Sequence, residues 1–482
     1  MIFNSLTYIL FLVFVAVFYW QIRGNVKLFL IFSSSIAFYG FWRIEFVGLL
    51  LFSVCLDYFI ARRMVLVSNK MRKVLLYVSL CSNVGLLIFF KYLYFIHDNI
   101  SLVSNTFGLQ VPPIALHIIL PLGISFYTFQ TISYTVDVFR GHLEPEKNFL
   151  AFASFVTFFP QLIAGPVLRA GEVIPQLKAE HSFKFEDVAY GIRRILYGLF
   201  LKVVIADNIG VSVDGGFLVP VEYLGALDVW TLAFLFGFQI YFDFSAYSHI
   251  AIGSARILGI RFPENFNFPY AALSPKDFWK RWHISLSSWI RDYLYLPLTG
   301  ARVVSQSEGG LSKVVNNKGG SADKALFISW SIMGLWHGAN WTFLIWGLYH
   351  AIVIYVYRIV SKTRLGKLPD TFSMLITLAV MMFSWIPFRA LTVGDTFALW
   401  STAINPMKFF VPLGLRENSY IVAFLLLIGF FVSYSARSKL FNFGATSKAF
   451  FVNLQETLLF AFLFTLTIIF LRPTDQFIYF QF

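Results

Sequence analysis

Charged residues are scarce in this sequence. Only 13% of its 482 residues are Asp, Glu, Lys or Arg, and 58% are hydrophobic, whereas soluble domains have roughly 25% charged residues. A soluble chain of this length would form about three domains. The hydrophobic cores of three such domains could not bury this many apolar side chains. The same composition excludes a disordered chain. It is typical of a polytopic membrane protein, in which roughly 20 apolar residues form each helix that crosses the bilayer.

Cysteine is scarce as well, and the common catalytic motifs are missing. The two cysteines, Cys55 and Cys81, lie in apolar segments and exclude a disulfide framework and a cysteine-rich metal site, so we expect no metal. The sequence has no phosphate-binding loop, dinucleotide fingerprint, G-x-S-x-G elbow or H-E-x-x-H zinc pair. The remaining candidates are ionisable groups inside apolar segments, because such groups are costly in a membrane and usually functional there.

Positive charge, in contrast, is in excess. The sequence has 38 Lys and Arg against 25 Asp and Glu, a formal charge of +13. Most basic residues lie in short loops, where they set topology and contact anionic headgroups, so we expect membrane lipids and not nucleic acid as partners. The densest cluster, within residues 62–73, is expected in the cytoplasm. Counting apolar runs from this cluster and from the basic residues after Arg437 places both termini outside the cytoplasm.

Apolar runs that could cross a bilayer occur along the whole chain, and we expect about 11 crossings plus re-entrant pieces. The first run lacks a basic n-region and a cleavage site, so we expect a retained helix and not a signal peptide. The runs lie at residues 2–21, 28–42, 46–61, 74–96, 114–139, 148–164, 187–206, 229–252, 325–357, 371–388, 420–436 and 450–471.

Two stretches depart from simple spans. The run 325–357 is too long for one span and is interrupted by glycines, so we expect a broken pair of half-helices, which a membrane tolerates only where protein buries the backbone. The polar stretch 300–324, rich in Gly, Ser and Asn, is expected to be a flexible linker. Together the pattern predicts a single all-α membrane domain over residues 1–482.

The segment Ser274–Gly300 holds the richest mixture of aromatic and basic residues. Ser274 and Pro275 followed by Asp277 indicate a helix start. The composition suits an amphipathic helix lying in the membrane interface. It also suits a surface that binds an anionic cofactor through charge-assisted hydrogen bonds. At helical spacing, His283 would share a face with Ser287.

The segment Trp330–Ala351 contains His337, with no charged residue between Lys324 and Arg358. His337 is therefore expected deep in the membrane, where burial would keep it neutral, as a general base requires. A buried histidine that only hydrogen-bonds a neighbouring helix is the alternative. His350 follows 13 residues later and would face away from His337 on a continuous helix.

Other polar groups lie inside apolar runs. The segment Gln239–Gly259 includes Asp243 and His249, which would line a polar passage or, the reading we favour, hold helices together by side-chain hydrogen bonds. For the membrane charges Lys91, Asp137 and Lys202 we expect pairing or snorkelling.

Taken together, these segments resemble the membrane-bound O-acyltransferase family, in its bacterial branch that O-acetylates alginate, peptidoglycan and cellulose. The resemblance covers nearly the whole chain. One departure is His249, where the branch usually has Asp, so the role of this position stays open. The motifs that carry the resemblance are DFWKRWHISLSSWIRDYLYLPL, GLWHGANWTFLIWGLYHA, FFPQLIAGPVLR (Phe158–Arg169) and FIYFQF (Phe477–Phe482).

The resemblance implies a helical fold around a tunnel and roles for individual residues. His337 corresponds to the invariant family histidine and is the expected general base, and His283 is expected to orient the thioester or the acceptor hydroxyl. Lys280, Arg281 and Arg291 are expected to contact the phosphates of acetyl-CoA. The remaining residues of the expected substrate site are Trp282, Trp336, Asn340 and Asp243.

The resemblance also implies a pathway in the bacterial inner membrane. Acetyl groups from cytoplasmic acetyl-CoA, with no resident cofactor, would leave on the outer side for a polysaccharide. An extracytoplasmic acetyltransferase is the expected partner, since the outward loops are short and carry no serine-hydrolase motif. The polymer stays open. The alternatives are D-alanyl transfer to teichoic acid, a scaffold subunit, or a transporter or flippase, against which the lack of an internal repeat speaks.

Overall fold

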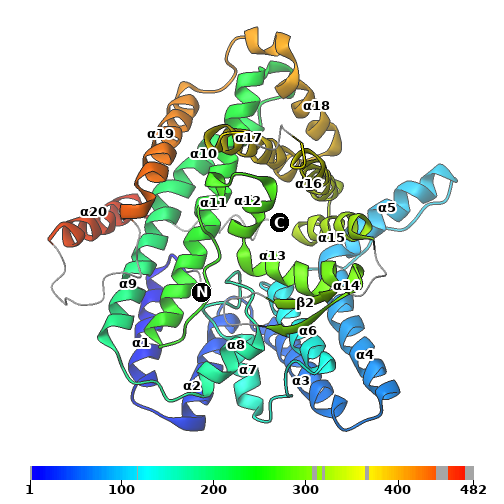
Figure 1. The fold of residues 1–482 in the computed structure, drawn as a ribbon, viewed down its shortest axis with the longest axis vertical. Helices are drawn as coiled ribbons and strands as arrows, with labels where there is room; N and C mark the ends of the chain where they lie inside the picture. Colours follow the sequence, from blue (N-terminus) through cyan, green and yellow to red (C-terminus); the bar gives the residue numbers. More distant parts are fainter. Residues whose placement is uncertain are drawn as a thin grey trace.

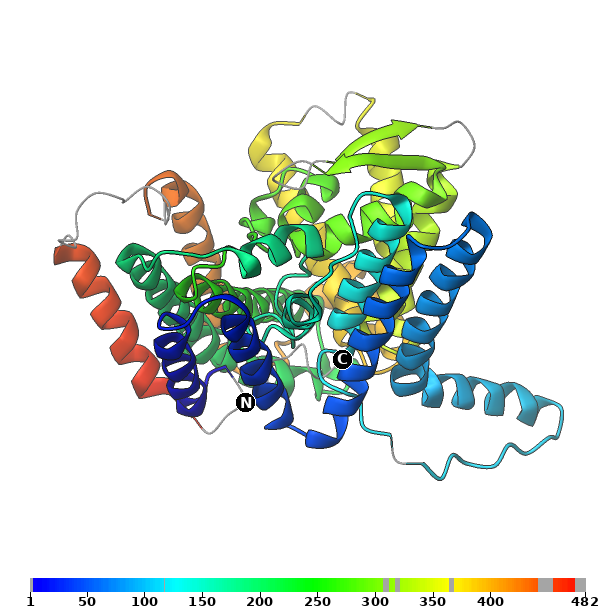
Figure 2. The same cartoon turned by 90° about the horizontal axis from the view of Figure 1, so that it is seen from below.

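The computed structural model describes residues 3–116, 118–306, 312–316, 321–363, 368–440 and 454–472. This part of the chain is helical apart from one two-stranded hairpin, which agrees with the predicted all-α membrane fold. Helices α11, α12 and α13 lie at the centre of the molecule and the others surround them (Figure 1). Seen from below, α5 projects away from the body (Figure 2).

The helices in chain order are α1 (Leu6–Tyr19), α2 (Gly24–Gly40), α3 (Val47–Met64), α4 (Asn69–Leu87), α5 (Leu93–Thr106), α6 (Ile124–Arg140), α7 (Phe149–Thr157), α8 (Ala170–Lys178), α9 (Phe185–Phe200), α10 (Asp207–Phe217), α11 (Ala226–Ile257), α12 (Pro275–Arg281), α13 (Ile284–Ile290), α14 (Leu296–Leu298), α15 (Ala322–His337), α16 (Trp341–Val360), α17 (Asp370–Arg389), α18 (Val393–Ile404), α19 (Glu417–Leu440) and α20 (Leu454–Phe470). Three π-helical segments, η2 (Ile88–Tyr92), η3 (Leu201–Ala206) and η6 (Arg291–Tyr295), join α4 to α5, α9 to α10 and α13 to α14.

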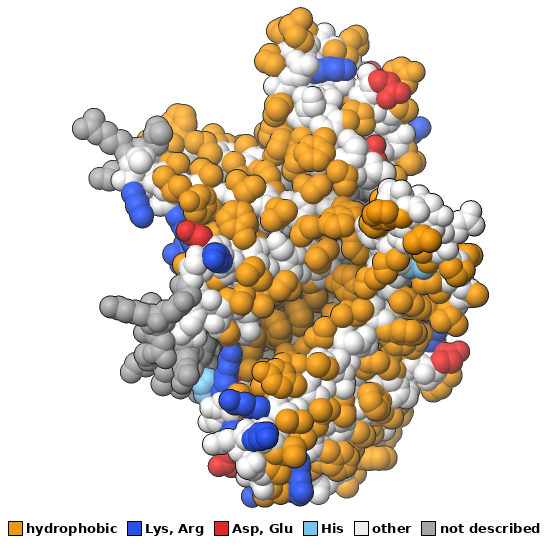
Figure 3. Space-filling model, turned by 90° about the vertical axis from the view of Figure 1, so that its right-hand side faces the viewer, with side chains coloured by type: hydrophobic (Ala, Val, Ile, Leu, Met, Phe, Trp, Pro, Cys, Tyr) orange, Lys and Arg blue, Asp and Glu red, His pale blue; other side chains and the backbone are white. Residues whose placement is uncertain are grey.

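Six helical segments among the described residues are long and apolar enough to cross a membrane, and shorter apolar helices accompany them. Hydrophobic side chains cover most of the face seen in Figure 3, and Lys and Arg gather toward one end of it. The chain is therefore a multi-pass membrane protein. Fewer helices than the predicted 11 meet these criteria of length and apolarity, and shorter helices could also cross. The count of about 11 crossings therefore stays a prediction. The six segments are Ile44–Met64, Asn69–Thr106, Phe185–Phe217, Ala226–Ile257, Trp341–Val360 and Asp370–Arg389.

Two sequence expectations were wrong. The apolar run 148–164 does not form a span, because its helix α7 has only nine residues and ends at Thr157. The stretch 300–324 is not a plain linker, since β1 (Ala301–Gln306) pairs antiparallel with β2 (Ser312–Asn316). Both strands contain a Val-Val pair, and β-branched residues favour extended backbone. The closing motif Phe477–Phe482 lies outside the described residues.

The predicted break in the run 325–357 is confirmed, but α16 is long and apolar enough to cross a membrane, so it is not a half-helix. α15 ends at His337, Gly338 is extended, and α16 begins after its N-cap Asn340. The two helices pack closely because two glycines face each other. A Cβ on Gly334 would lie 2.3 Å from the Phe343 carbonyl oxygen, and one on Gly347 would lie 2.2 Å from the carbonyl oxygen of Trp330.

This contact predicts the effect of one added methyl group. In a Gly347→Ala variant, the new Cβ meets a backbone oxygen that cannot move alone, so α15 and α16 must separate, at a cost of about 1–3 kcal/mol. Thermal unfolding of the detergent-solubilised protein is expected to show a lower Tm. Gly85→Ala is the matched control, since nothing lies within 4 Å of its Cβ. An equal Tm for the two variants would contradict the packing argument.

Candidate active site

His337 occupies the last position of α15, directly before the break at Gly338. Its side chain is buried. The imidazole packs edge-on against Trp346 of α16, with ring centroids 5.0 Å apart, and against Phe388 of α17 at 5.2 Å. His337 is thus enclosed by aromatic rings from two other helices, and its depth in the membrane stays a prediction.

His283 does not lie within a helix. Ser274 caps α12 as predicted, with its hydroxyl accepting from the Asp277 amide at 3.1 Å, but α12 ends at Arg281. His283 then takes a left-handed backbone conformation with φ of 41° before α13 begins. The continuous amphipathic helix, and the helical face that His283 would share with Ser287, are therefore wrong. The turn directs His283 into the interior, where 1% of the residue is exposed.

Asn265 holds His283 in place. Its Oδ1 accepts from His283 Nδ1 at 3.1 Å and from the Ser285 hydroxyl at 2.9 Å, and its Nδ2 donates to the Ser248 hydroxyl at 3.2 Å. The proton of His283 therefore lies on Nδ1 and the lone pair on Nε2. Nε2 has no hydrogen-bond partner among the described residues. Burial lowers the pKa of His283 to about 3, so the imidazole is neutral at physiological pH.

Sequence reasoning missed Asn265. The available signal was one of two asparagines within the aromatic stretch RFPENFNFPY. This signal is weak, because the stretch precedes the histidine by 18 residues and only the tertiary fold brings the two together.

An aromatic cluster connects the two histidine-containing segments. Trp282, next to His283, packs against Trp385 with ring centroids 5.0 Å apart. Trp385 contacts Phe388 at 5.4 Å, and Phe388 contacts His337. The structure thus brings His283, Trp282 and His337 to one buried region.

His350 belongs to the same region, contrary to the expectation from a continuous helix. Because the chain breaks at Gly338, α16 turns back along α15 and directs His350 toward the cluster. Its ring packs against Trp346 at 4.7 Å and Trp279 at 4.9 Å. Neither of its ring nitrogens has a hydrogen-bond partner among the described residues.

The predicted basic residues are partly engaged in ion pairs. Lys280 is exposed. Arg281 Nε lies 2.9 Å from an Asp277 carboxylate oxygen, and Arg291 Nε lies 2.7 Å from Asp292. Each guanidinium has further N–H donors that could meet a phosphate, so these three residues stay candidates for donor binding.

Asp292 carries a second, buried partner. Arg169 Nη2 lies 2.5 Å from its other carboxylate oxygen, and the side chains are 7% and 1% exposed. Arg169 comes from the segment Phe158–Arg169, so this pair ties that motif to the segment Ser274–Gly300.

The other predicted substrate residues have structural partners. Asp243 lies 2.7 Å from the buried ammonium of Lys202, which also pairs with Asp207; this agrees with helix packing and with the expected pairing of Lys202. Trp336 stacks on Phe129 at 5.2 Å. Asn340 caps α16 and accepts from the Thr342 amide at 3.0 Å.

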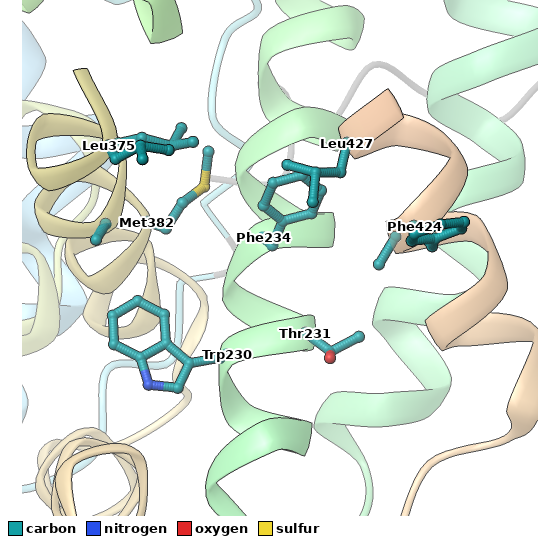
Figure 4. A pocket seen from close by; sticks show the side chains of 10 residues that line it. Trp230, Thr231, Phe234, Leu375, Met382, Phe424 and Leu427 are labelled. Atoms are coloured by element: carbon teal, nitrogen blue, oxygen red, sulfur yellow. The ribbon is translucent and has the colours of Figure 1, made fainter. Parts of the chain in front are cut away.

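An apolar pocket of about 320 Å³ lies between α11, α17 and α19 (Figure 4). None of the predicted site residues lines it, and Thr231 is the one polar side chain among its walls. The pocket therefore suits a hydrocarbon chain and not thioester chemistry. Within the described residues, no three His, Cys, Asp or Glu side chains are grouped so as to hold a metal ion.

Comparison with known proteins decides the family. The sequence profile of the membrane-bound O-acyltransferase family matches residues 140–386, which include both histidine-containing segments. The chain belongs to this family. It is 37% identical to a probable alginate O-acetylase of Azotobacter vinelandii, over 81% of this chain and 75% of the relative. It is 36% identical to a peptidoglycan O-acetyltransferase of Helicobacter pylori, over 74% and 70% respectively.

A teichoic acid D-alanyltransferase of Bacillus subtilis is also similar, with 30% identity over 50% of this chain and 60% of the relative. The resemblance inferred from the motifs is confirmed, and this membrane-bound O-acyltransferase is an enzyme. The roles of its individual residues stay predictions.

The buried ion pair predicts a large effect on stability. Asp292→Asn leaves the Arg169 guanidinium buried without its charge partner, and breaking such a pair costs about 3–5 kcal/mol. Asp277→Asn is the matched control, because its pair with Arg281 is about one quarter exposed and such pairs contribute below about 1 kcal/mol. We expect a clearly lower Tm for the first variant only. Similar Tm values would show that the pair between Arg169 and Asp292 does not stabilise the fold.

Proposed function

We propose that this enzyme transfers acetyl groups from cytoplasmic acetyl-CoA across the bacterial inner membrane for O-acetylation of an extracytoplasmic polysaccharide. Relatives named for alginate and peptidoglycan O-acetylation, each about one third identical over most of the chain, support the acetyl group and the polymer class. The observation that carries the proposal is the meeting of His283 and His337 in one buried aromatic cluster.

His337 acts as the general base in this proposal. Its imidazole accepts the proton of an acceptor hydroxyl as the oxygen attacks the acetyl carbonyl carbon. The carbon–sulfur bond then breaks, and the imidazolium returns the proton to the thiolate of coenzyme A. The aromatic rings around His337 keep water away, which limits hydrolysis of the thioester.

His283 orients the thioester or the hydroxyl. Asn265 fixes its Nδ1–H, so Nε2 presents a lone pair into the buried region without rotation of the ring. A hydroxyl that donates to Nε2 would be held in a defined position, and such orientation lowers the entropic part of the barrier.

The donor and the partner complete the proposal. Lys280, Arg281 and Arg291 would contact the phosphates of acetyl-CoA at the cytoplasmic mouth, and both termini would lie outside. An extracytoplasmic acetyltransferase would receive the acetyl group and pass it to the polymer. The donor is consumed as a substrate, so no resident cofactor is required.

Replacement of the base tests this function. Purified protein is incubated with acetyl-CoA labelled in the acetyl group, and cleavage of the thioester or transfer of label is measured. Without a general base the rate is expected to fall by about 10²–10⁴-fold in His337→Ala. His181→Ala is the control, because His181 only hydrogen-bonds the Gln176 carbonyl oxygen in a loop.

The same assay separates the alternatives. Full activity of His337→Ala would remove this histidine from the mechanism. A native protein that leaves the thioester intact while binding or moving a solute would instead be a transporter. Use of a D-alanyl thioester and not an acetyl thioester would place the enzyme with the teichoic acid relatives.

A further inference from the structure

Lys91 and Tyr92 contact the helix end that carries His337. The Lys91 ammonium donates to the carbonyl oxygens of Trp336 and His337, with Nζ–O distances of 2.6 and 2.9 Å. The Tyr92 hydroxyl donates to the carbonyl oxygen of Leu335 at 2.7 Å. Two consecutive side chains from one helix thus bind the backbone of three consecutive residues that end in His337.

These carbonyl groups need partners from elsewhere in the protein. The last four carbonyls of a helix have no intrahelical donor, and inside a membrane no bulk water replaces it. The chain turns extended at Gly338, with φ of −161° and ψ of 151°, so the backbone beyond α15 does not fold back to cap it. A cation at a helix C-terminus is also favourable because of the helix dipole.

The same long helical segment holds the other side of the break. In α5, Asn99 Oδ1 accepts from the indole N–H of Trp341, the first residue of α16, at 2.8 Å. The Phe95 ring packs against the same indole at 5.5 Å. The segment Asn69–Thr106 therefore contacts both sides of the break between α15 and α16.

A π-helical turn accompanies the contact. Segment η2 (Ile88–Tyr92) separates α4 from α5 and ends with the two donors. A π-turn inserts one extra residue into a helix at the cost of regular hydrogen bonding, and such turns are frequent at functional sites. Here the irregular turn lies where Lys91 and Tyr92 reach α15.

We propose that Lys91 and Tyr92 are positioning residues that fix the direction of the His337 side chain by holding the last turn of α15. The inference rests on the proposed function, in which His337 is the base. From the sequence alone, Lys91 was expected only to pair with another charge or to snorkel. The proposal gives it a role in the geometry of the reaction. Neither residue touches the reacting atoms.

Steady-state kinetics on the full chain tests the proposal. Lys91→Met removes both donations at similar side-chain length, and Tyr92→Phe removes a single hydroxyl. Because a misplacement of about 1 Å can cost on the order of 10²-fold in rate, we expect kcat to fall about 10²-fold in Lys91→Met and about tenfold in Tyr92→Phe. The KM for acetyl-CoA should stay unchanged, since the donor phosphates bind elsewhere.

A matched control separates position from general stability. Lys27 is a buried lysine, whereas Lys91 is half-buried, and the Lys27 ammonium lies 4.3 Å from the centre of the Tyr19 ring in another part of the molecule. Lys27→Met is expected to keep the native kcat. A fall in kcat of equal size in Lys27→Met and Lys91→Met would overturn the specific role of Lys91.

Restoring the ammonium group at position 91 by chemical modification tests whether its charge is needed. A purely structural role of the side chain would not depend on this charge. In a background with Cys55 and Cys81 replaced by Ser, Lys91→Cys is alkylated with 2-bromoethylamine, which rebuilds a side chain of lysine length and charge. Alkylation with 2-bromoethanol gives an uncharged group of similar length. We expect recovery of most of kcat with the amine reagent only. Equal recovery with both reagents would overturn the proposal.

His337→Ala, measured in parallel, distinguishes the two levels of failure. If His337→Ala is inactive while Lys91→Met and Tyr92→Phe keep the native kcat, the positioning role is wrong and the proposed function stands. If His337→Ala is fully active, the proposed function fails first. Should Lys91→Met not fold, Tyr92→Phe alone decides, because it changes one oxygen atom.

Discussion

Backbone that leaves helical geometry inside a bilayer has no water to satisfy its polar groups, and this constraint governs the centre of the molecule. The chain breaks twice near the candidate site, at Gly338 and at His283. At the first break, Lys91 and Tyr92 donate to the exposed carbonyls and Asn340 caps the next helix. At the second, the backbone and side-chain oxygens of Asn265 accept from the amides of Ile284 and Ser285. Each break thus has polar partners from distant parts of the chain.

The same breaks bring the two histidines together. A straight span would carry His337 and His350 to different faces, whereas the reversal after Gly338 directs both toward Trp346. The rings of Trp282, Trp385 and Phe388 form a continuous series of contacts between the two segments. An acyltransferase benefits from such an interior, since a neutral imidazole accepts a proton and scarce water limits thioester hydrolysis.

Much of this arrangement was predictable from the sequence, and the failures have physical causes. Apolarity and glycine spacing predicted the break between α15 and α16, and local capping chemistry predicted the start of α12 at Ser274. The left-handed turn at His283 was not predictable, because a non-glycine residue adopts it only under tertiary constraint. Asn265 was missed because only the tertiary fold brings it to His283. The hairpin within 300–324 was missed because polar residues around its strands are typical of a linker.

The glycine contact between α15 and α16 limits how molecules can travel through the protein. With Gly334 and Gly347 so close that a methyl group on either would overlap the backbone of the other helix, no opening exists between these two helices at that level. Neither the acyl donor nor the acceptor can enter there. Any route to His337 must therefore run along other faces of α15.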